Sequence, residues 1–395
     1  MPFTVANSFE FFRANDARRD AVFLPEHPCR AAVSLHSHTM FSEESLDMVP
    51  RYTGNVPVLG RAIREQEAEY RLRRGRPFDF GHAFWTPPLG PRQAYRLEEK
   101  QIQRRLQLPA LVSLSDHDDI RAPGLLRVMS RFARAPISTE WTVPFGTTFF
   151  HIGVHNLPPE IAATLHLELA AFTAEPDPAK LGPLLDRLSA IPDLLLVLNH
   201  PLWDEKGIGV AAHRQELTAL LRAHATRLHA LELNGLRSWR ENREVLPFAQ
   251  AANLPVVSGG DRHGREPNAI LNLTEATTFS GFVEEVRYSR RSHILFMPQY
   301  HEPLRLRVLQ TMVDVVRHYP ENALGRRLWS DRVFYRDPVS KSTVPLSEIW
   351  TDGGPQIVRH FIRAMRILGW SGVQSALRLA LEDRAAGVPG GEVSL

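Results

Sequence analysis

Cysteine is nearly absent from this sequence of 395 residues, in which Cys29 is the single example. The chain therefore cannot form an internal disulfide, and such a composition suits a reducing compartment. Long apolar runs are absent too: no stretch of about 18 apolar residues, the length needed to span a membrane, occurs. Residues 1–20 mix acidic and basic side chains with apolar ones, unlike a secretory signal peptide. We therefore expect a cytoplasmic protein that has no membrane partner.

Lysine is scarce, and nearly all of the 47 basic residues are arginines. Arginine binds phosphate bidentately, but genomic base composition is the better explanation for a bulk excess of arginine. The net charge of +3 does not indicate a general nucleic-acid-binding protein. The hydrophobic share of 43% is ordinary for a globular protein, and the length allows one large domain or two smaller ones.

Short apolar runs alternate with amphipathic stretches over most of the chain. Runs typical of strands occupy residues 31–35, 111–114, 149–154, 194–198, 231–233, 256–258 and 293–297. Stretches with helical spacing occupy residues 58–74, 211–228, 238–252 and 282–290. This alternation predicts an α/β fold with a mainly parallel sheet. Polar clusters follow the apolar runs, where (β/α) barrels carry their chemistry, so a TIM-like barrel is the more specific prediction.

Two regions interrupt the alternation. Residues 47–109 are long, proline-rich and basic in the middle, and we interpret them as an insertion after the first strand, which either contacts substrate or pads the barrel. Residues 301–395 show helical spacing at 304–319 and 356–382, so we predict a helical C-terminal extension. The barrel domain is expected within residues 1–300.

Histidine and carboxylate residues stand where the apolar runs end. His36 and His38 follow the run at 31–35, and residues i and i+2 of an extended chain face the same side, so both imidazoles can reach one ion. Glu43, in the polar loop that follows, is a further candidate ligand. His117 lies in the sequence SDHDD, and charges stacked at the end of a buried strand are costly without a cation.

Further candidates end the later runs. Glu140 ends the stretch PISTE, and His200 ends the most hydrophobic run of the chain. His151 and His155 share one face of an expected strand, so either of the two suffices as a ligand.

The last pair, Asp261 and His263, repeats the i, i+2 spacing after two glycines that allow a sharp turn. A mixture of imidazole and carboxylate without cysteine suits Zn²⁺, Mn²⁺ or Fe²⁺. The candidates exceed what a single ion requires, so we expect two or three divalent metal ions that share carboxylates.

The ordered motifs HSHTMFSEES, SLSDHDD, STE, HIGV, LNHP, LELNG and SGGDRHG resemble those of the PHP (polymerase and histidinol phosphatase) superfamily. The resemblance covers residues 31–298 apart from the insertion. It implies a distorted (β/α)₇ barrel with a trinuclear metal site at the carboxyl ends of the strands.

The resemblance also implies roles for single residues. His36, His38 and Asp261 correspond to ligands of one ion, which Glu140 bridges to a second, and His263 completes the second or third site. Glu43 stands where many members have Asp. The remaining ligand positions fall to His117, His151, with His155 as its alternative, and His200. Asp116 and Asp118 are expected to orient His117.

Arg262 stands where many members carry a small residue, and it would place a guanidinium beside the metals to bind phosphate. Arg265 and Arg237 are weaker candidates for the same contact. The predicted function is hydrolysis of a phosphate ester, a monoester or a diester, by metal-activated hydroxide, with His263 as a possible acid. The substrate would be a small phosphorylated molecule or a nucleic-acid end. Amide or ester hydrolysis and a non-catalytic metal-binding module are the alternatives, and the oligomeric state is left open.

Overall fold

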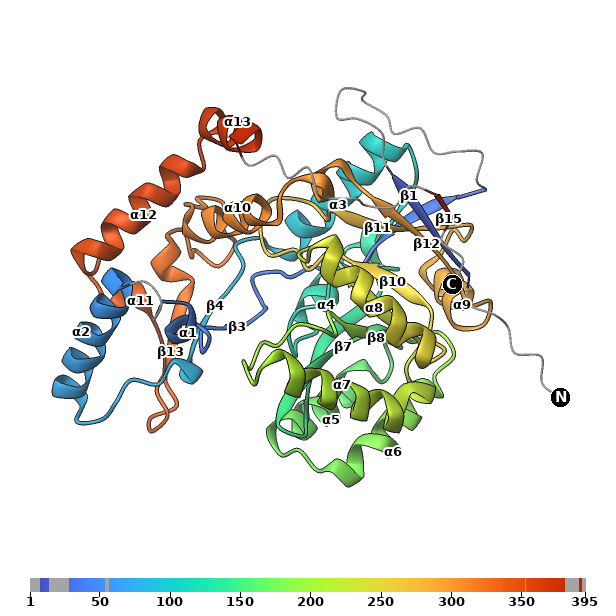
Figure 1. Ribbon diagram of the computed structural model, residues 1–395, viewed down its shortest axis with the longest axis horizontal. Coiled ribbons are helices and arrows are strands. Elements are labelled where there is room, and N and C mark those ends of the chain that lie inside the picture. The colour runs from blue at the N-terminus through green and yellow to red at the C-terminus, as the bar shows by residue number, and fades with distance from the viewer. Residues whose placement is uncertain (1–7, 14–27, 54–56, 352, 381–390, 393–395) are drawn as a thin grey trace.

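The computed structural model describes residues 8–13, 28–53, 57–351, 353–380 and 391–392. Its strands pair into three sheets, of six, five and four strands, and helices lie between and around them (Figure 1). The alternation of apolar runs with amphipathic stretches is thus confirmed as a mixed α/β fold.

The six-stranded sheet has the order β15-β1-β12-β11-β2-β5. In chain order its strands are β1 (Ser8–Arg13), β2 (Ala31–Ser34), β5 (Ala110–Val112), β11 (Ile270–Thr274), β12 (Arg291–Phe296) and β15 (Gly391–Glu392). β2 and β5 pair in parallel, whereas β11 is antiparallel to both β2 and β12.

The five-stranded sheet has the order β10-β9-β8-β7-β6. Its strands are β6 (Ile137–Phe145), β7 (Thr148–Leu157), β8 (Leu195–Asn199), β9 (Ala230–Asn234) and β10 (Val256–Gly259). β8, β9 and β10 are parallel, but β7 is antiparallel to both of its neighbours. The sheets are therefore mixed, and the expectation of a mainly parallel sheet is wrong.

The two larger sheets approach each other at their edges. Isolated bridges join Ser37 to Arg262 and His117 to Glu140, and Gly260 donates a backbone hydrogen bond of 2.9 Å to Leu35. Among the described strands, hydrogen-bonded pairing is not continuous from one large sheet to the other, so the strands do not form one closed barrel. The bridges nevertheless bring the carboxyl ends of β2, β5 and β10 close to β6.

Helices cover the outer faces of these sheets. They are α3 (Pro91–Leu106), α4 (Arg121–Arg127), α5 (Ala162–Ala174), α6 (Pro178–Ser189), α7 (Val210–His224), α8 (Trp239–Ala251) and α9 (Phe279–Arg287). α9 illustrates why they form: Thr278 caps its first turn, and Phe282, Val283 and Val286 make one buried face at helical spacing. Among the described residues, no helix is both long and apolar enough to cross a membrane.

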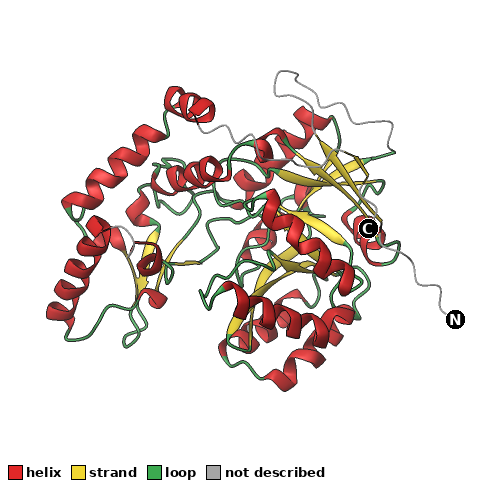
Figure 2. Cartoon of the chain, in the orientation of Figure 1, coloured by secondary structure: helices red, strands yellow, loops and turns green. Residues whose placement is uncertain are grey.

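The predicted insertion and the C-terminal region meet in the third sheet, with the order β14-β13-β4-β3. It contains β3 (Glu44–Ser45), β4 (Ala83–Trp85), β13 (Val333–Arg336) and β14 (Thr343–Pro345). The accompanying helices are α1 (Val49–Thr53), α2 (Pro57–Arg74), α10 (Leu304–Val316), α11 (Leu346–Ile349), α12 (Gln356–Leu368) and α13 (Ser371–Ala380). Figure 2 shows this small sheet set apart from the larger ones.

The C-terminal extension is therefore not purely helical, because β13 pairs with β4 of the insertion. The helix expected over residues 356–382 is two helices, α12 and α13, which are separated at Gly369. Residues 381–382 lie outside the described part of the chain.

Candidate metal centre

The structure brings together all of the predicted ligands except Glu43. Most of them follow strands of the two larger sheets, and Glu140 and His151 lie within β6 and β7. The ligands that meet are His36, His38, His117, Glu140, His151, His200, Asp261 and His263. Because they come from separate strand ends, the cluster exists only in the folded chain.

Glu140 lies at the centre of the cluster and is fully buried. Its Oε2 is close to three imidazole nitrogens: His36 Nε2 at 2.9 Å, His38 Nε2 at 3.4 Å and His117 Nδ1 at 3.4 Å. Its Oε1 lies 3.1 Å from His200 Nε2 and 3.5 Å from His151 Nδ1. A single carboxylate therefore faces imidazoles on both of its oxygens, the arrangement that a bridging ligand needs.

Asp261 faces the same imidazoles from another side. Its Oδ1 lies 3.7 Å from His36 Nε2 and 3.5 Å from His38 Nε2. The ligand atoms of these three residues lie within 4.8 Å of one another, close enough to surround one ion.

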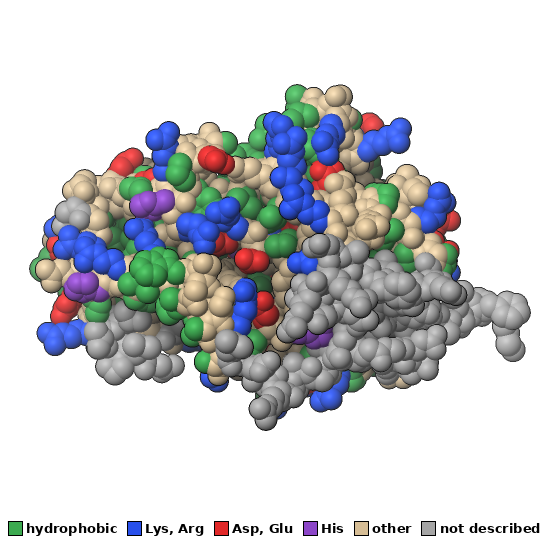
Figure 3. Space-filling view, turned by 90° about the horizontal axis from the view of Figure 1, so that it is seen from above, with side chains coloured by type: hydrophobic (Ala, Val, Ile, Leu, Met, Phe, Trp, Pro, Cys, Tyr) green, Lys and Arg blue, Asp and Glu red, His purple; other side chains and the backbone are tan. Residues whose placement is uncertain are grey.

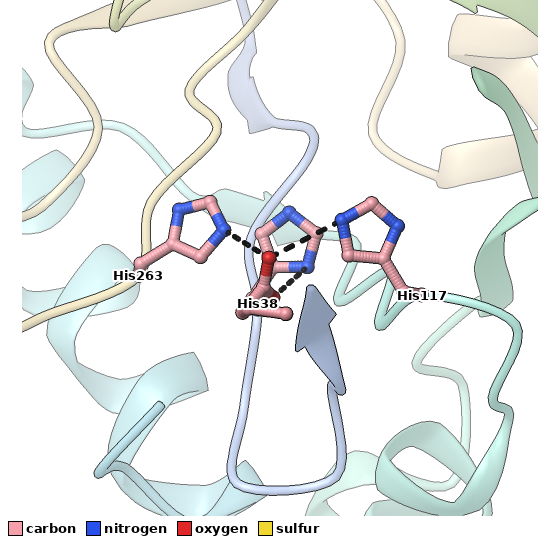
Figure 4. A group of neighbouring side chains, drawn as sticks. His38, His117 and His263 are labelled. Carbon is pink, nitrogen blue, oxygen red and sulfur yellow. Dashed lines mark ion pairs between the residues drawn. The ribbon is translucent and has the colours of Figure 1, made fainter. Parts of the chain in front are cut away.

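Glu44, rather than Glu43, supplies the carboxylate of the next group. Its Oε2 lies 3.1 Å from His263 Nε2 and 3.4 Å from His117 Nε2, and its Oε1 lies 3.7 Å from His38 Nδ1. Figure 4 shows the imidazoles of His38, His117 and His263 directed toward one another.

The structure does not bring Glu43 to this cluster. Its side chain is 43% exposed, and both carboxylate oxygens accept hydrogen bonds from Arg336 Nη2, at 2.8 and 3.0 Å. Neighbouring residues of an extended chain face opposite sides, so only one of two adjacent glutamates can point inward. We therefore replace Glu43 by Glu44 in the candidate ligand set.

The residues fit a group of divalent cations. His38 Nε2 and Glu44 Oε1 are buried without a hydrogen-bond partner, although each faces other ligand atoms. Glu44, Glu140 and Asp261 are buried carboxylates, and burying so much negative charge is costly without a cation. The described residues form four groups that could each hold an ion. Four residues belong to two groups each: His36, His38, His117 and Glu140. Such sharing is typical of sites with more than one ion.

The electrostatics favour the ionised form of the carboxylates and the neutral form of His38. Burial lowers the pKa of His36 and His117, but Glu140 and the other nearby carboxylates together raise it by more, so the net pKa of each of these two imidazoles is well above its usual range. Burial raises the pKa of Glu140, but the neighbouring His36, His117 and His151 lower it by more. The net pKa of this carboxyl group is therefore well below its usual range. Burial and the neighbouring His263 lower the pKa of His38 to about 4. Ionised carboxylate and neutral imidazole are the forms that bind metal ions.

Glu232 is a buried residue of the centre that the sequence analysis did not single out. Its Oε1 lies 2.6 Å from His36 Nδ1, and its Oε2 accepts a hydrogen bond of 2.7 Å from the backbone of His200. A carboxylate on the far nitrogen of an imidazole fixes its orientation and raises its basicity. A Cβ at Gly259 would collide with this carboxylate, so the position requires glycine. Glu232 is the glutamate of the motif LELNG, so the sequence did contain a charged residue within an apolar strand. The alternation of faces along a strand does not show which residue the Glu232 side chain contacts.

Three cluster residues adopt left-handed backbone conformations: His36 at φ 61°, His200 at φ 26° and Asp261 at φ 53°. Such values are uncommon for residues other than glycine, and they concentrate at functional sites where the surrounding fold holds them. Each residue lies one or two positions after the end of a strand, so the turn in the backbone aims its side chain across the end of the sheet.

The structure separates the two histidines of β7. His151 lies in the cluster, whereas His155 is buried below it, with Nδ1 2.9 Å from Ser113 Oγ. Asp116 and Asp118 do not contact the imidazole of His117. Asp116 accepts hydrogen bonds from the backbone and hydroxyl of Thr39, and Asp118 accepts one from the backbone of Thr142.

Arg262 does not point toward the cluster. Its side chain is 3% exposed, and its Nε donates a hydrogen bond of 2.6 Å to Glu98 Oε1. Two other nitrogens donate to the carbonyls of Gly264 and His38. The guanidinium is thus fully engaged within the protein, and the structure contradicts its expected place beside the metals.

The two weaker arginine candidates lie farther out. The guanidinium of Arg237 lies 3.7 Å from the ring centroid of Trp203, which lines a small cavity together with His151 and His200. Arg265 is exposed, and its backbone nitrogen donates to Asp314. Neither guanidinium is seen to contact a cluster residue.

A larger cavity of about 440 Å³ opens beside the cluster. His117 and His151 lie at its inner side, and Phe41 and Phe149 contribute aromatic wall. Its lining also contains five carboxylates but, among the described residues, no lysine or arginine: Glu43, Asp47, Asp118, Asp119 and Glu205. Glu205, which the sequence analysis also missed, is shared with the smaller cavity, and burial raises its pKa.

No protein-family model matches the sequence, and no curated protein does. Three solved structures are similar to the chain. An amidohydrolase from Chromobacterium violaceum, with bound sulfate and no metal, is 14% identical, with 45% of this chain and 84% of that chain covered and a TM-score of 0.32. A provisionally assigned metal-dependent phosphoesterase from Bifidobacterium adolescentis is 15% identical, with 52% and 92% covered and a TM-score of 0.33. PsfC from Pseudomonas syringae is 15% identical, with 71% and 96% covered and a TM-score of 0.36. Likenesses at this level establish no shared activity.

Proposed function

We propose that this protein is a metal-dependent hydrolase that uses two or three divalent ions, Zn²⁺, Mn²⁺ or Fe²⁺. The observation that carries the proposal is the position of Glu140, whose two oxygens face five imidazoles at 2.9–3.5 Å. A structural ion needs one closed set of four ligands, whereas this cluster offers overlapping groups beside an open cavity.

The ordered motifs and the joined edges of the larger sheets support a relationship to the PHP superfamily. Seven strands, β2 and β5–β10, follow one another around the cluster when the bridges at Ser37 and His117 are counted. We propose that they form the distorted (β/α)₇ barrel that the sequence predicts.

Bound divalent ions would activate water and stabilise negative charge that develops on the substrate. The protein supplies the geometry. Glu232 holds the ring of His36, and Asn199 Nδ2 donates to Glu140 Oε1 at 3.0 Å, so the bridging carboxylate cannot rotate freely. His263 fits a ligand role better than an acid role, because its Nε2 faces Glu44 and its Nδ1 faces the carbonyl of Asp261.

A phosphate ester is the substrate that we propose, since adjacent ions suit an in-line displacement at phosphorus. The acidic cavity lining favours a small substrate over a nucleic-acid chain, because a polyanion would be repelled there. On the face drawn in Figure 3, Lys and Arg side chains are spread widely with Asp and Glu between them, as the small net charge leads one to expect.

Amide or ester hydrolysis is the second candidate, and a specific observation favours it. Arg262, the arginine expected to bind phosphate, is turned away and bound to Glu98. Since the described residues of the cavity lining include no guanidinium, the ions themselves would have to select phosphate over a carbonyl group.

The test combines metal analysis with assays on three chromogenic esters: a phosphomonoester, a phosphodiester and a carboxylic ester. We expect two or three ions per chain and cleavage of a phosphate ester that His36→Ala and Asp261→Ala abolish. Glu65→Gln is the matched control, because Glu65 is 62% exposed and lies outside both the cluster and the cavity lining. Cleavage of the carboxylic ester alone would favour the second candidate, and a protein that takes up no ion would contradict the proposal.

A further inference from the structure

Glu44 reaches the metal centre by a different route from the other ligands. It lies on β3, a two-residue strand of the four-stranded sheet, whereas the other ligands lie on strands of the two larger sheets or in the loops that follow them. Its Oε1 is buried and accepts no hydrogen bond, so no donor fixes that oxygen. Among the described residues, its Oε2 meets only His263 and His117, which are candidate ligands themselves, so the backbone of β3 is what brings the carboxylate to the cluster.

β3 is held by β4, and β4 is held by the C-terminal region. Trp85 of β4 pairs with Glu44 on one side and with Val333 of β13 on the other. β3 and β4 alone would be a pair of two- and three-residue strands, and isolated strand pairs are marginally stable in water. β13, separated from β3 by nearly 300 residues, completes the sheet.

Side chains strengthen this attachment. The rings of Phe84 on β4 and Phe334 on β13 stack with centroids 5.2 Å apart, and both side chains are buried. Arg332, directly before β13, is 1% exposed and donates hydrogen bonds to the carbonyls of Val315 and Arg317, at 2.7 and 2.8 Å. β13 is thus anchored both to β4 and to the end of α10.

The same sheet touches a second ligand of this group. The ring of Trp85 lies 5.9 Å from the ring of His263, and His263 Nε2 lies 3.1 Å from Glu44. A displacement of β4 would therefore disturb both the carboxylate and one imidazole of the group His38, Glu44, His117 and His263.

We propose that β13 of the C-terminal region is a positioning element for the metal position formed by His38, Glu44, His117 and His263. This inference rests on the proposed metal-dependent function. Loosening β13 lowers the occupancy of this one position, while the groups around Glu140 that lack Glu44 keep their ions.

The test measures Mn²⁺ per chain by elemental analysis after equilibrium dialysis, with full-length protein throughout. Phe334→Ala removes the ring that stacks on Phe84, and Glu44→Gln removes the carboxylate itself. Leu185→Ala is the matched control, because Leu185 is fully buried on α6 in the core beside the five-stranded sheet and belongs to neither the four-stranded sheet nor α10.

At a Mn²⁺ concentration that saturates the unchanged protein, we expect Phe334→Ala and Glu44→Gln each to lose one ion. Alternatively, the dissociation constant of that ion rises at least about 10-fold, the effect of losing a residue that holds a metal ligand. Leu185→Ala should bind as many ions as the unchanged protein. If Phe334→Ala does not fold, Phe334→Leu replaces it and is judged by the same measurement.

Full occupancy in the Phe334 variant would overturn the inference, and so would an equal loss in Leu185→Ala, which would reveal general destabilisation. If the unchanged protein binds no Mn²⁺, both this inference and the proposed function fail. If the ions behave as expected but no ester is cleaved, only the proposed function fails.

Discussion

The two halves of the metal centre are built in different ways. The half around Glu140 is made by residues on or just after strands of the larger sheets, whose fully buried strands form the core. In the half around Glu44, the carboxylate lies on the two-residue strand β3. The sheet of β3 is completed by β13 and β14 from the C-terminal region. The difference shows that one cluster can combine ligands fixed by the core with a ligand fixed by an appended region.

Glu140→Gln should have the largest effect, because it removes charge from the carboxylate that faces His38 and His117, the two imidazoles that also belong to the Glu44 half. We expect loss of most bound metal and a fall in activity of more than about 100-fold, since even residues that only hold ligands cost 10–100-fold. Metal analysis and kcat/KM measure this. Retention of all ions would contradict a bridging role.

Arg262→Ala tests the junction between the halves, where the guanidinium links the loop of His263 to the carbonyl of His38. The variant leaves Glu98 buried without its partner, so the free energy of unfolding should fall by about 3–5 kcal/mol. Denaturant titration measures this fall. If stability is unchanged while KM for a phosphate ester rises strongly, Arg262 binds substrate after all.

Glu232→Gln weakens the Glu140 half alone. The amide cannot accept from His36 Nδ1 and the backbone of His200 as a carboxylate does, so metal affinity should fall about 10–100-fold. Competition with a chelator of known affinity measures this. Because Glu232 does not touch Glu44, the ion of the Glu44 half should be retained, and its loss would contradict the separation of the halves.

Arg336→Ala should have the smallest effect on the Glu44 half. The ion pair with Glu43 is about half exposed, and pairs of this kind contribute roughly 0–1 kcal/mol. Thermal unfolding and Mn²⁺ occupancy should therefore barely change. A marked loss of the Glu44 ion would show that Arg336, rather than the packing of Phe334, positions β3.

Much of the Glu140 half could be predicted from local sequence. His36 and His38 stand two residues apart after an apolar run, and Asp261 and His263 repeat that spacing, so the positions of strand ends indicate which side chains converge. The sequence also predicted β8, whose fully buried pattern follows from a continuous apolar run.

The carboxylate of the Glu44 half could not be predicted in the same way, although its three histidines could. The choice between Glu43 and Glu44 depends on which face of β3 turns inward, and β3 pairs with β4 some 40 residues later. The pairing of β4 with β13 depends on contacts far apart in the chain, for which the helical spacing of the C-terminal region gave no signal.

The amino-acid sequence by itself determined the α/β alternation and the order of histidine and carboxylate residues at the strand ends, because both follow from local periodicity. Only the tertiary structure decided that Glu44 faces the cluster, that Arg262 pairs with Glu98 instead of facing the cavity, and that β13 completes the small sheet. The physical reason is that a side chain's direction and partner depend on packing between distant segments, which no local pattern encodes.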